Sequence, residues 1–160
     1  MSEILGKIYC MFESLFGRYL GEYLWGYNCN TQTYDGHNLF NNIGLMALLI
    51  SLALVLLYYY AINHTRFSQW WHWTIVLLIS GGINFLLAYS WINNDFVNGN
   101  IGDCLKYLRD DEDNIKSQLI YQNDCLMFGL SNFFVSIIFF IVFSFMFKWW
   151  SSNCKHSPFL

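Results

Sequence analysis

Cysteine is the residue type in this sequence with the most evident chemistry, and the five cysteines are an odd number. They are Cys10, Cys29, Cys104, Cys125 and Cys154. In the predicted four-helix arrangement Cys29, Cys104 and Cys125 share the non-cytoplasmic side. Cys104 with Cys125 can then close a loop disulfide if that side is oxidising.

Paired loop cysteines in a small helical membrane protein invite comparison with the quinone-coupled disulfide oxidases of bacterial inner membranes. Those enzymes have a Cys-x-x-Cys in the first loop, whereas here Cys29 stands alone between Asn28 and Asn30. The relay to a quinone is therefore missing, and thiol–disulfide exchange is kept only as a remote alternative.

Other catalytic chemistry has no motif in this chain. The four histidines are scattered and form no HxxxH pair, and no CxxC pair accompanies them, so no metal site is predicted. Nucleophile elbows and phosphate-binding loops are also missing. We therefore expect neither an enzyme nor a cofactor. Eight basic residues against eleven acidic ones give no basic footprint, which argues against nucleic-acid binding.

The charged residues of the opening segment follow a helical spacing. On a helix over residues 3–25, Lys7, Glu13, Arg18 and Glu22 fall on one narrow stripe, and large apolar side chains cover the rest. Such a stripe cannot face lipid cheaply. It predicts an amphipathic helix that spans or embeds in the membrane as a fourth helix, with its stripe against other protein or water. A helix lying on the membrane surface is the alternative.

Small residues share that stripe. Gly17 and Gly21 form a GxxxG spacing, which lets a second backbone approach closely and predicts an oligomer contact. Arg18 and Glu22 stand four residues apart and can pair along the helix.

A second group of charges lies in the 94–124 connection. Asp110, Asp111, Glu112 and Asp113 are typical of a solvated turn. A cation-binding ring in an oligomer and a docking surface for a protein partner are the sharper alternatives.

The elements that position these residues follow from the composition: 56% of the chain is hydrophobic, 21% aromatic and only 12% charged. A soluble domain of 160 residues cannot bury so much apolar surface, so the lipid bilayer is the natural solvent. Three runs without acidic or basic residues, at about 43–62, 70–92 and 125–147, are each long enough to cross it. We therefore predict an all-α integral membrane protein, one domain over 1–160, with an acidic extramembrane loop at 94–124.

Polar residues inside the runs are few. Asn84 and Asn132 are typical of hydrogen bonds between membrane helices, and the alternative is a permeation path. With four helices both termini share one side, and an acidic loop that is easy to export favours cytoplasmic termini, in a bacterial inner membrane. The count of Lys and Arg does not decide the orientation.

The leading functional hypothesis is a homo-oligomer that forms or gates an ion-permeable pore, as a stress or defence effector or sensor. A single bundle of this size is too small to enclose a conduit, so a pore needs several copies. The alternative is a membrane anchor, immunity protein or regulatory subunit that binds a protein partner through its acidic loop.

Overall fold

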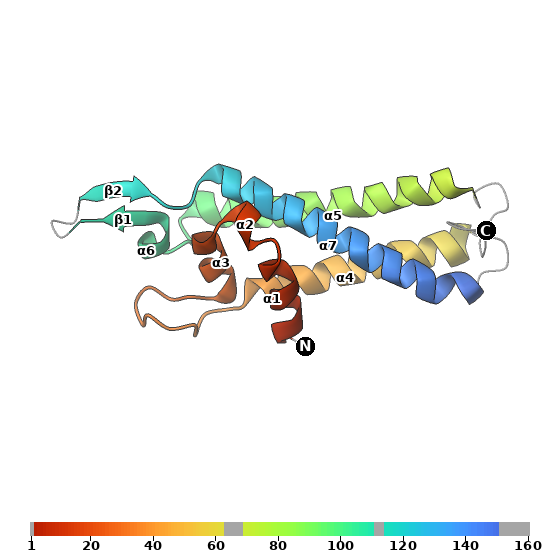
Figure 1. Ribbon diagram of the computed structural model, residues 1–160, viewed down its shortest axis with the longest axis horizontal. Helices are drawn as coiled ribbons and strands as arrows, with labels where there is room; N and C mark the ends of the chain where they lie inside the picture. Colours follow the sequence, from red (N-terminus) through yellow and green to blue (C-terminus); the bar gives the residue numbers. More distant parts are fainter. Residues whose placement is uncertain (1, 63–68, 111–113, 151–160) are drawn as a thin grey trace.

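Three long helices run side by side along the molecule in the computed structural model, which describes residues 2–62, 69–110 and 114–150 (Figure 1). They are α4 (Leu39–Leu56), α5 (Trp70–Asn98) and α7 (Gln122–Phe147). The π-helix η1 (Leu57–Ile62) continues α4, and the 3-10 helix η3 (Lys148–Trp150) continues α7. Within the described residues, three helices are long and apolar enough to cross a membrane, which is compatible with a membrane location.

The three predicted runs are confirmed as helices. Each helix extends a few residues beyond its apolar run at one end, and a capping residue marks that end. The Asn38 side chain accepts a hydrogen bond from the Asn41 amide (3.1 Å) at the start of α4. Gly99, with φ of 75°, ends α5 in the left-handed conformation. The Tyr121 amide donates to the Asp124 carboxylate (2.8 Å) at the start of α7.

Serine side chains join the three long helices near the middle of the bundle. The Ser51 hydroxyl of α4 lies 3.4 Å from the Ser80 hydroxyl of α5 and 3.3 Å from the Ser136 carbonyl of α7. All three serines are fully buried. Small side chains at this level allow the helices to approach closely.

The opening segment is not one helix, so the prediction of a continuous helix over 3–25 is wrong. It folds into α1 (Ser2–Cys10), α2 (Glu13–Phe16) and α3 (Arg18–Trp25). Gly17 separates α2 from α3 with φ of 83° and ψ of 152°, a conformation almost restricted to glycine. None of the three pieces is long enough to span a bilayer, and the described spans number three.

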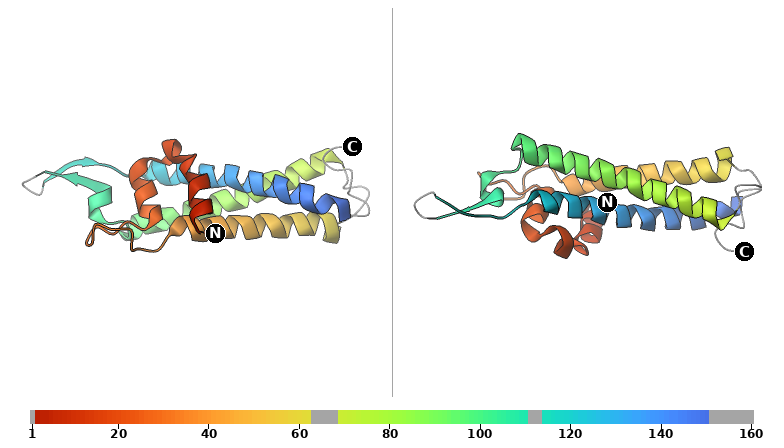
Figure 2. Two further views of the ribbon diagram at one scale, coloured as in Figure 1. Left: turned by 60° about the horizontal axis from the view of Figure 1, so that its bottom comes forward. Right: turned by 90° about the horizontal axis from the view of Figure 1, so that it is seen from above.

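Aromatic side chains fix the three short helices to the bundle. Figure 2 shows α1 and α2 packed on the flank formed by α4 and α7, away from α5. Tyr9 of α1 stacks on Phe40 of α4, with ring centroids 5.3 Å apart. Phe16 of α2 meets Phe128 of α7 edge to face, at 5.4 Å. These four rings are 0–1% exposed, so the opening segment is part of the core.

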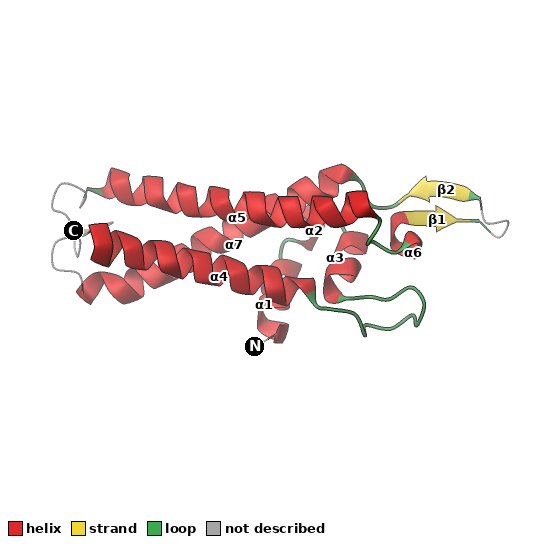
Figure 3. Ribbon diagram, turned by 180° about the vertical axis from the view of Figure 1, so that it is seen from behind, coloured by secondary structure: helices red, strands yellow, loops and turns green. Residues whose placement is uncertain are grey.

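The connection between α5 and α7 contains a β-hairpin that the sequence did not predict. The short helix α6 (Asp103–Lys106) leads into β1 (Tyr107–Arg109), which pairs antiparallel with β2 (Ile115–Gln118) (Figure 3). Tyr107 faces Gln118 and Leu108 faces Ser117, and a bulge then shifts the register at Arg109. The acidic connection is thus a folded structure that projects beyond the bundle.

The long helices alternate in direction. α4 and α7 both run away from the hairpin, and α5 runs back toward it (Figure 1). We call the hairpin end, residues 18–38 and 94–121, the head. The predicted arrangement with both termini on one side required four spanning helices, and the described residues contain three helices of that length.

Candidate functional site

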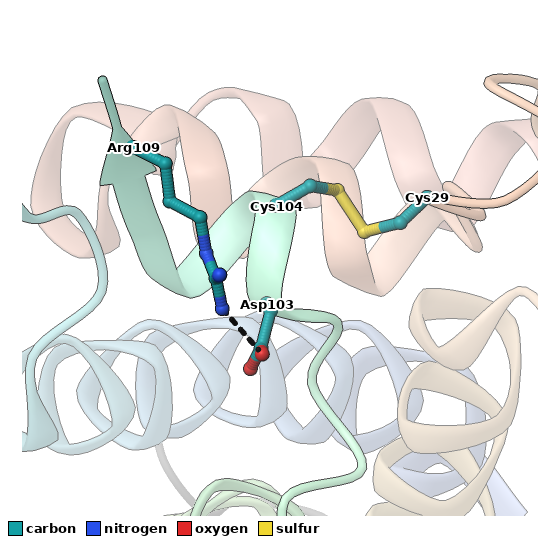
Figure 4. Close-up of polar contacts among 4 residues, drawn as sticks. All are labelled: Cys29, Asp103, Cys104 and Arg109. Carbon is teal, nitrogen blue, oxygen red and sulfur yellow. Dashed lines mark hydrogen bonds and ion pairs between the residues drawn. A yellow bond between two sulfur atoms is a disulfide. The ribbon is translucent and has the colours of Figure 1, made fainter. Parts of the chain in front are cut away.

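A disulfide holds the head together. Cys29, in the loop after α3, is bonded to Cys104 of α6 across 75 residues of sequence (Figure 4). The predicted Cys104–Cys125 disulfide is therefore wrong. Cys125 is a free thiol buried in the core at the first turn of α7, and Cys10 is a free, exposed thiol on α1. Cys154 lies outside the described residues.

The loop that carries Cys29 is held by hydrogen bonds between its own backbone groups. Its two glycines cross so tightly that a Cβ on Gly36 would lie 2.6 Å from the Gly26 carbonyl oxygen. The Gly36 amide donates to that same oxygen (2.9 Å), and the Asn28 amide donates to the Thr33 carbonyl (2.9 Å). The disulfide thus crosslinks two segments that each have local structure.

Between these segments lies a cleft of about 830 Å³. Its walls come from the end of α3, residues 26–30 and 36–39, the last turns of α5 and residues 99–104. The Cys29–Cys104 bond is part of the wall. Because the walls come from four separate parts of the chain, only the folded head forms this space.

Two side chains from different helices meet in the cleft wall. Tyr23 of α3 and Asp95 of α5 both line the cleft. Burial, and then the negative charge of Asp95, raise the pKa of Tyr23 above its usual range, so its hydroxyl stays neutral. Asn100 donates to the Asp95 carboxylate, at 2.9 Å.

An ion pair close to the disulfide joins α6 to strand β1 of the hairpin. Arg109 Nη2 lies 3.1 Å from the Asp103 carboxylate (Figure 4). Both side chains are largely exposed, so this pair contributes little to stability, about 0–1 kcal/mol. The positive charge of Arg109 lies beside the negative charge of Asp103 at the edge of the cleft.

Only part of the predicted acidic turn can be located. Asp110 is exposed, and its amide donates to the Asn114 carbonyl (3.0 Å), which begins the turn of the hairpin. Asp111, Glu112 and Asp113 lie outside the described residues. Their predicted roles as a cation ring or a docking surface therefore stay predictions.

Asn84 and Asn132 come together in the middle of the bundle. The Asn132 side-chain amide donates to the Asn84 carbonyl (2.8 Å), and the Asn84 amide donates to the Ser80 carbonyl (3.0 Å). The Tyr9 hydroxyl donates to the Asn132 side-chain oxygen. Both asparagines are 1% exposed. The Asn132 side chain thus makes the predicted hydrogen bond between helices, whereas the Asn84 side chain bonds within α5 and its carbonyl accepts from Asn132.

The four charges of the predicted stripe do not gather as one seam. Arg18 pairs with Glu22 within α3 (3.0 Å), as their spacing predicted. Glu13 joins this pair in the wall of a smaller pocket of about 200 Å³. Lys7 is exposed on α1 and does not line that pocket.

The two glycines of the GxxxG spacing do not lie on one continuous helix. Gly17 is the break between α2 and α3, whereas Gly21 is buried in α3, facing the Phe16 ring. A GxxxG ridge needs both glycines on one continuous helix, so the predicted contact surface does not form in this geometry. An oligomer itself stays a prediction.

Sequence reasoning missed the cleft residues. The local spacing of Tyr23, Trp91 and Asp95 gives no sign that these residues share one space. The available signal was Cys29, whose pairing with Cys104 would have brought the end of α3 next to the end of α5.

Comparison with protein families, with curated proteins and with solved structures found no match to this chain. In the part of the chain that the structure describes, no group of three or more His, Cys, Asp or Glu is placed to hold a metal ion. The fold by itself defines the class: a bundle of three helices long enough to span a membrane, with a disulfide-linked head at one end.

Proposed function

We propose that this protein is a membrane-anchored interaction protein, in which α4, α5 and α7 form the anchor and the head binds a protein partner. The observation that carries the proposal is the Cys29–Cys104 bond, which joins the loop after α3 to the base of the hairpin. A pure anchor needs no such crosslinked structure outside its spans. A preformed surface binds with less loss of conformational entropy than a flexible loop does.

The disulfide also supports an orientation. Disulfides form and persist in oxidising compartments, so the head faces outward and the far end of the bundle faces the cytoplasm. In a bacterial inner membrane the head side is the periplasm. All eleven acidic residues precede α4 or lie at 95–124, and none follows α7's first turn.

The count of basic residues points the other way. In the sequence, five of the eight Lys and Arg precede α4 or lie at 94–124, and the other three are Arg66, Lys148 and Lys155. The positive-inside rule would therefore favour a cytoplasmic head. We give the disulfide more weight, because it cannot persist in the cytoplasm, whereas a difference of two residues is a weak bias.

The homo-oligomeric pore stays a prediction. Large apolar side chains such as Leu49, Leu78 and Ile138 are exposed along the described spans, as lipid contact requires. The buried serines and asparagines bond within one chain. The pore hypothesis is tested by measuring ion flux through purified protein in liposomes. We expect a flux no greater than in empty liposomes, and a larger flux would support the pore.

Thiol–disulfide exchange also stays a remote alternative. In the described part of the chain, the free cysteines are the exposed Cys10 on α1 and the buried Cys125. A relay requires a second thiol that reaches the Cys29–Cys104 bond. Turnover of a dithiol substrate by the purified protein would support this alternative.

The partner proposal is tested by co-purification from native membranes in mild detergent. We expect one defined polypeptide to accompany the wild-type chain, and to be lost when residues 107–118 are replaced by a Gly-Ser linker of equal length. Lys148→Gln, at the far end of the bundle, is the control and should retain the polypeptide. The tagged polypeptide should in turn recover this chain.

A monodisperse chain without any such polypeptide would contradict the proposal. So would equal recovery with the linker variant, because the head would then make no contribution to binding.

A further inference from the structure

The cleft in the head has an unusual balance of charges. Among its lining residues are two carboxylates, Asp95 and Asp103, and no lysine or arginine. Asp103 pairs with Arg109. Asp95 accepts a hydrogen bond from Asn100 and forms no ion pair with a lysine or arginine of the described residues. The cleft therefore holds a half-buried carboxylate without a lysine or arginine partner, and His37 adds an imidazole to its lining.

Aromatic residues share the cleft wall with Asp95. Tyr23, Tyr27 and Trp91 all line the cleft. The ring faces of Trp and Tyr attract cations, and aromatic rings beside a carboxylate are the usual recognition site for an alkylated ammonium group. In the part of the chain that the structure describes, no group of three or more His, Cys, Asp or Glu is placed to hold a metal ion here.

We propose that this cleft binds an organic ammonium group, held by the Asp95 carboxylate and the rings of Tyr23, Tyr27 and Trp91. An anion is disfavoured by the carboxylate, and a purely apolar ligand would bury the charge of Asp95 without compensation. The volume of about 830 Å³ exceeds what a single quaternary ammonium needs, so the ligand carries a further polar portion toward the open side. The inference goes beyond the proposed function, since it concerns a small ligand and not the protein partner.

Two kinds of molecule could supply the organic ammonium group. One is the headgroup of phosphatidylethanolamine or phosphatidylcholine, because Trp91 lies two turns from the end of α5, where an outward-facing Trp is typical of the headgroup level. The other is a free amine on the head side of the membrane. The shared ammonium group is what the cleft recognises.

The test is titration of the full-length protein in phosphatidylglycerol nanodiscs with tetramethylammonium chloride, against sodium chloride at equal ionic strength, by isothermal calorimetry. We expect saturable binding of tetramethylammonium alone. Asp95→Asn removes the charge and keeps the size of the side chain, and it should weaken binding at least tenfold; Trp91→Leu should do the same. Asp35→Asn, an exposed change in the loop that carries Cys29 and outside the cleft lining, is the matched control and should bind like the wild type.

Peptide mapping without reduction should find the Cys29–Cys104 bond in each variant, which shows that the head is folded. If Asp95→Asn fails this check, Trp91→Leu and Tyr27→Leu provide the test. No saturable binding, or equal affinity in a folded Asp95→Asn protein, would overturn the proposal. Neither result would affect co-purification of a partner, so the two proposals fail separately.

Replacing the lipid with phosphatidylcholine separates the two sources. Weaker apparent affinity for tetramethylammonium in these nanodiscs indicates that the headgroup already occupies the cleft. Unchanged affinity indicates a soluble amine.

Discussion

Asn132 connects three parts of the chain through one side chain. It accepts a hydrogen bond from Tyr9 of the opening segment and donates one to the Asn84 carbonyl of α5. In an apolar bundle each of these polar groups would otherwise lack a partner, and an unpaired buried group costs about 1–3 kcal/mol. This explains why a polar residue is placed in the middle of a span.

Tyr9→Phe tests this role, because it removes only the hydroxyl. We expect a loss of about 0.5–2 kcal/mol in the free energy of unfolding, since Asn132 keeps its packing but loses a donor. Denaturant titration in detergent, followed by tryptophan fluorescence, measures it. Tyr19→Phe is the matched control, because Tyr19 is 41% exposed in the same segment. Equal stabilities of the two variants would show that the Tyr9 hydrogen bond contributes nothing.

At the scale of elements, the opening segment depends on Gly17. Its φ of 83° and ψ of 152° turn the chain between α2 and α3, so that Phe16 and Leu20 both reach the core. A continuous helix would carry the chain away from the bundle instead.

Gly17→Ala should therefore destabilise the protein by about 1–3 kcal/mol, the usual cost of a side chain in this conformation. If residues 3–25 formed one helix, the same change would be neutral or stabilising. The comparison is Gly82→Ala in α5, where an added Cβ meets nothing within 4 Å and alanine should be tolerated. Thermal unfolding of both variants in nanodiscs measures the difference.

The disulfide is the second element-scale prediction. Peptide mapping of unreduced protein should give a linked pair of peptides that contain Cys29 and Cys104, unchanged by Cys125→Ser. Cys29→Ser should destabilise the head by up to about 4 kcal/mol, the loop-closure value for a crosslink of this separation. The spans already restrict that loop, so we expect less than the full value. A Cys104–Cys125 peptide pair would contradict the structure.

At the scale of the whole molecule, the charged residues are distributed unevenly along the sequence. The sequence before α4 together with residues 94–124 contains eleven acidic and five basic residues, a net charge of −6, and the rest of the sequence contains three basic residues, +3, which together give the −3 of the chain. Under a potential negative inside, this distribution favours an external head.

Labelling of single cysteines in intact cells tests this orientation. In a background with Cys10, Cys125 and Cys154 replaced by serine, Ser117→Cys on the hairpin should react with a membrane-impermeant maleimide. Lys148→Cys at the other end should react only after the cells are opened. The reverse pattern would place the head in the cytoplasm, where the Cys29–Cys104 bond could not persist.

The three spans were predictable from sequence because each depends on local composition: about twenty apolar residues without a charge have few alternatives to a membrane helix. The pairing of Arg18 with Glu22 was likewise local, since four residues make one helical turn. The polar role of Asn84 and Asn132 followed from the cost of leaving an amide unpaired among apolar side chains.

The remaining features depend on contacts between distant segments. A helical spacing over 3–25 does not reveal that Gly17 adopts a conformation closed to other residues, because glycine also occurs inside helices. The pairing of Cys104 depends on which cysteine the fold brings near, and Cys29 is 75 residues away in sequence. The cleft beside it combines α3, α5 and two loops, so only the tertiary structure places Tyr23, Trp91 and Asp95 around one space.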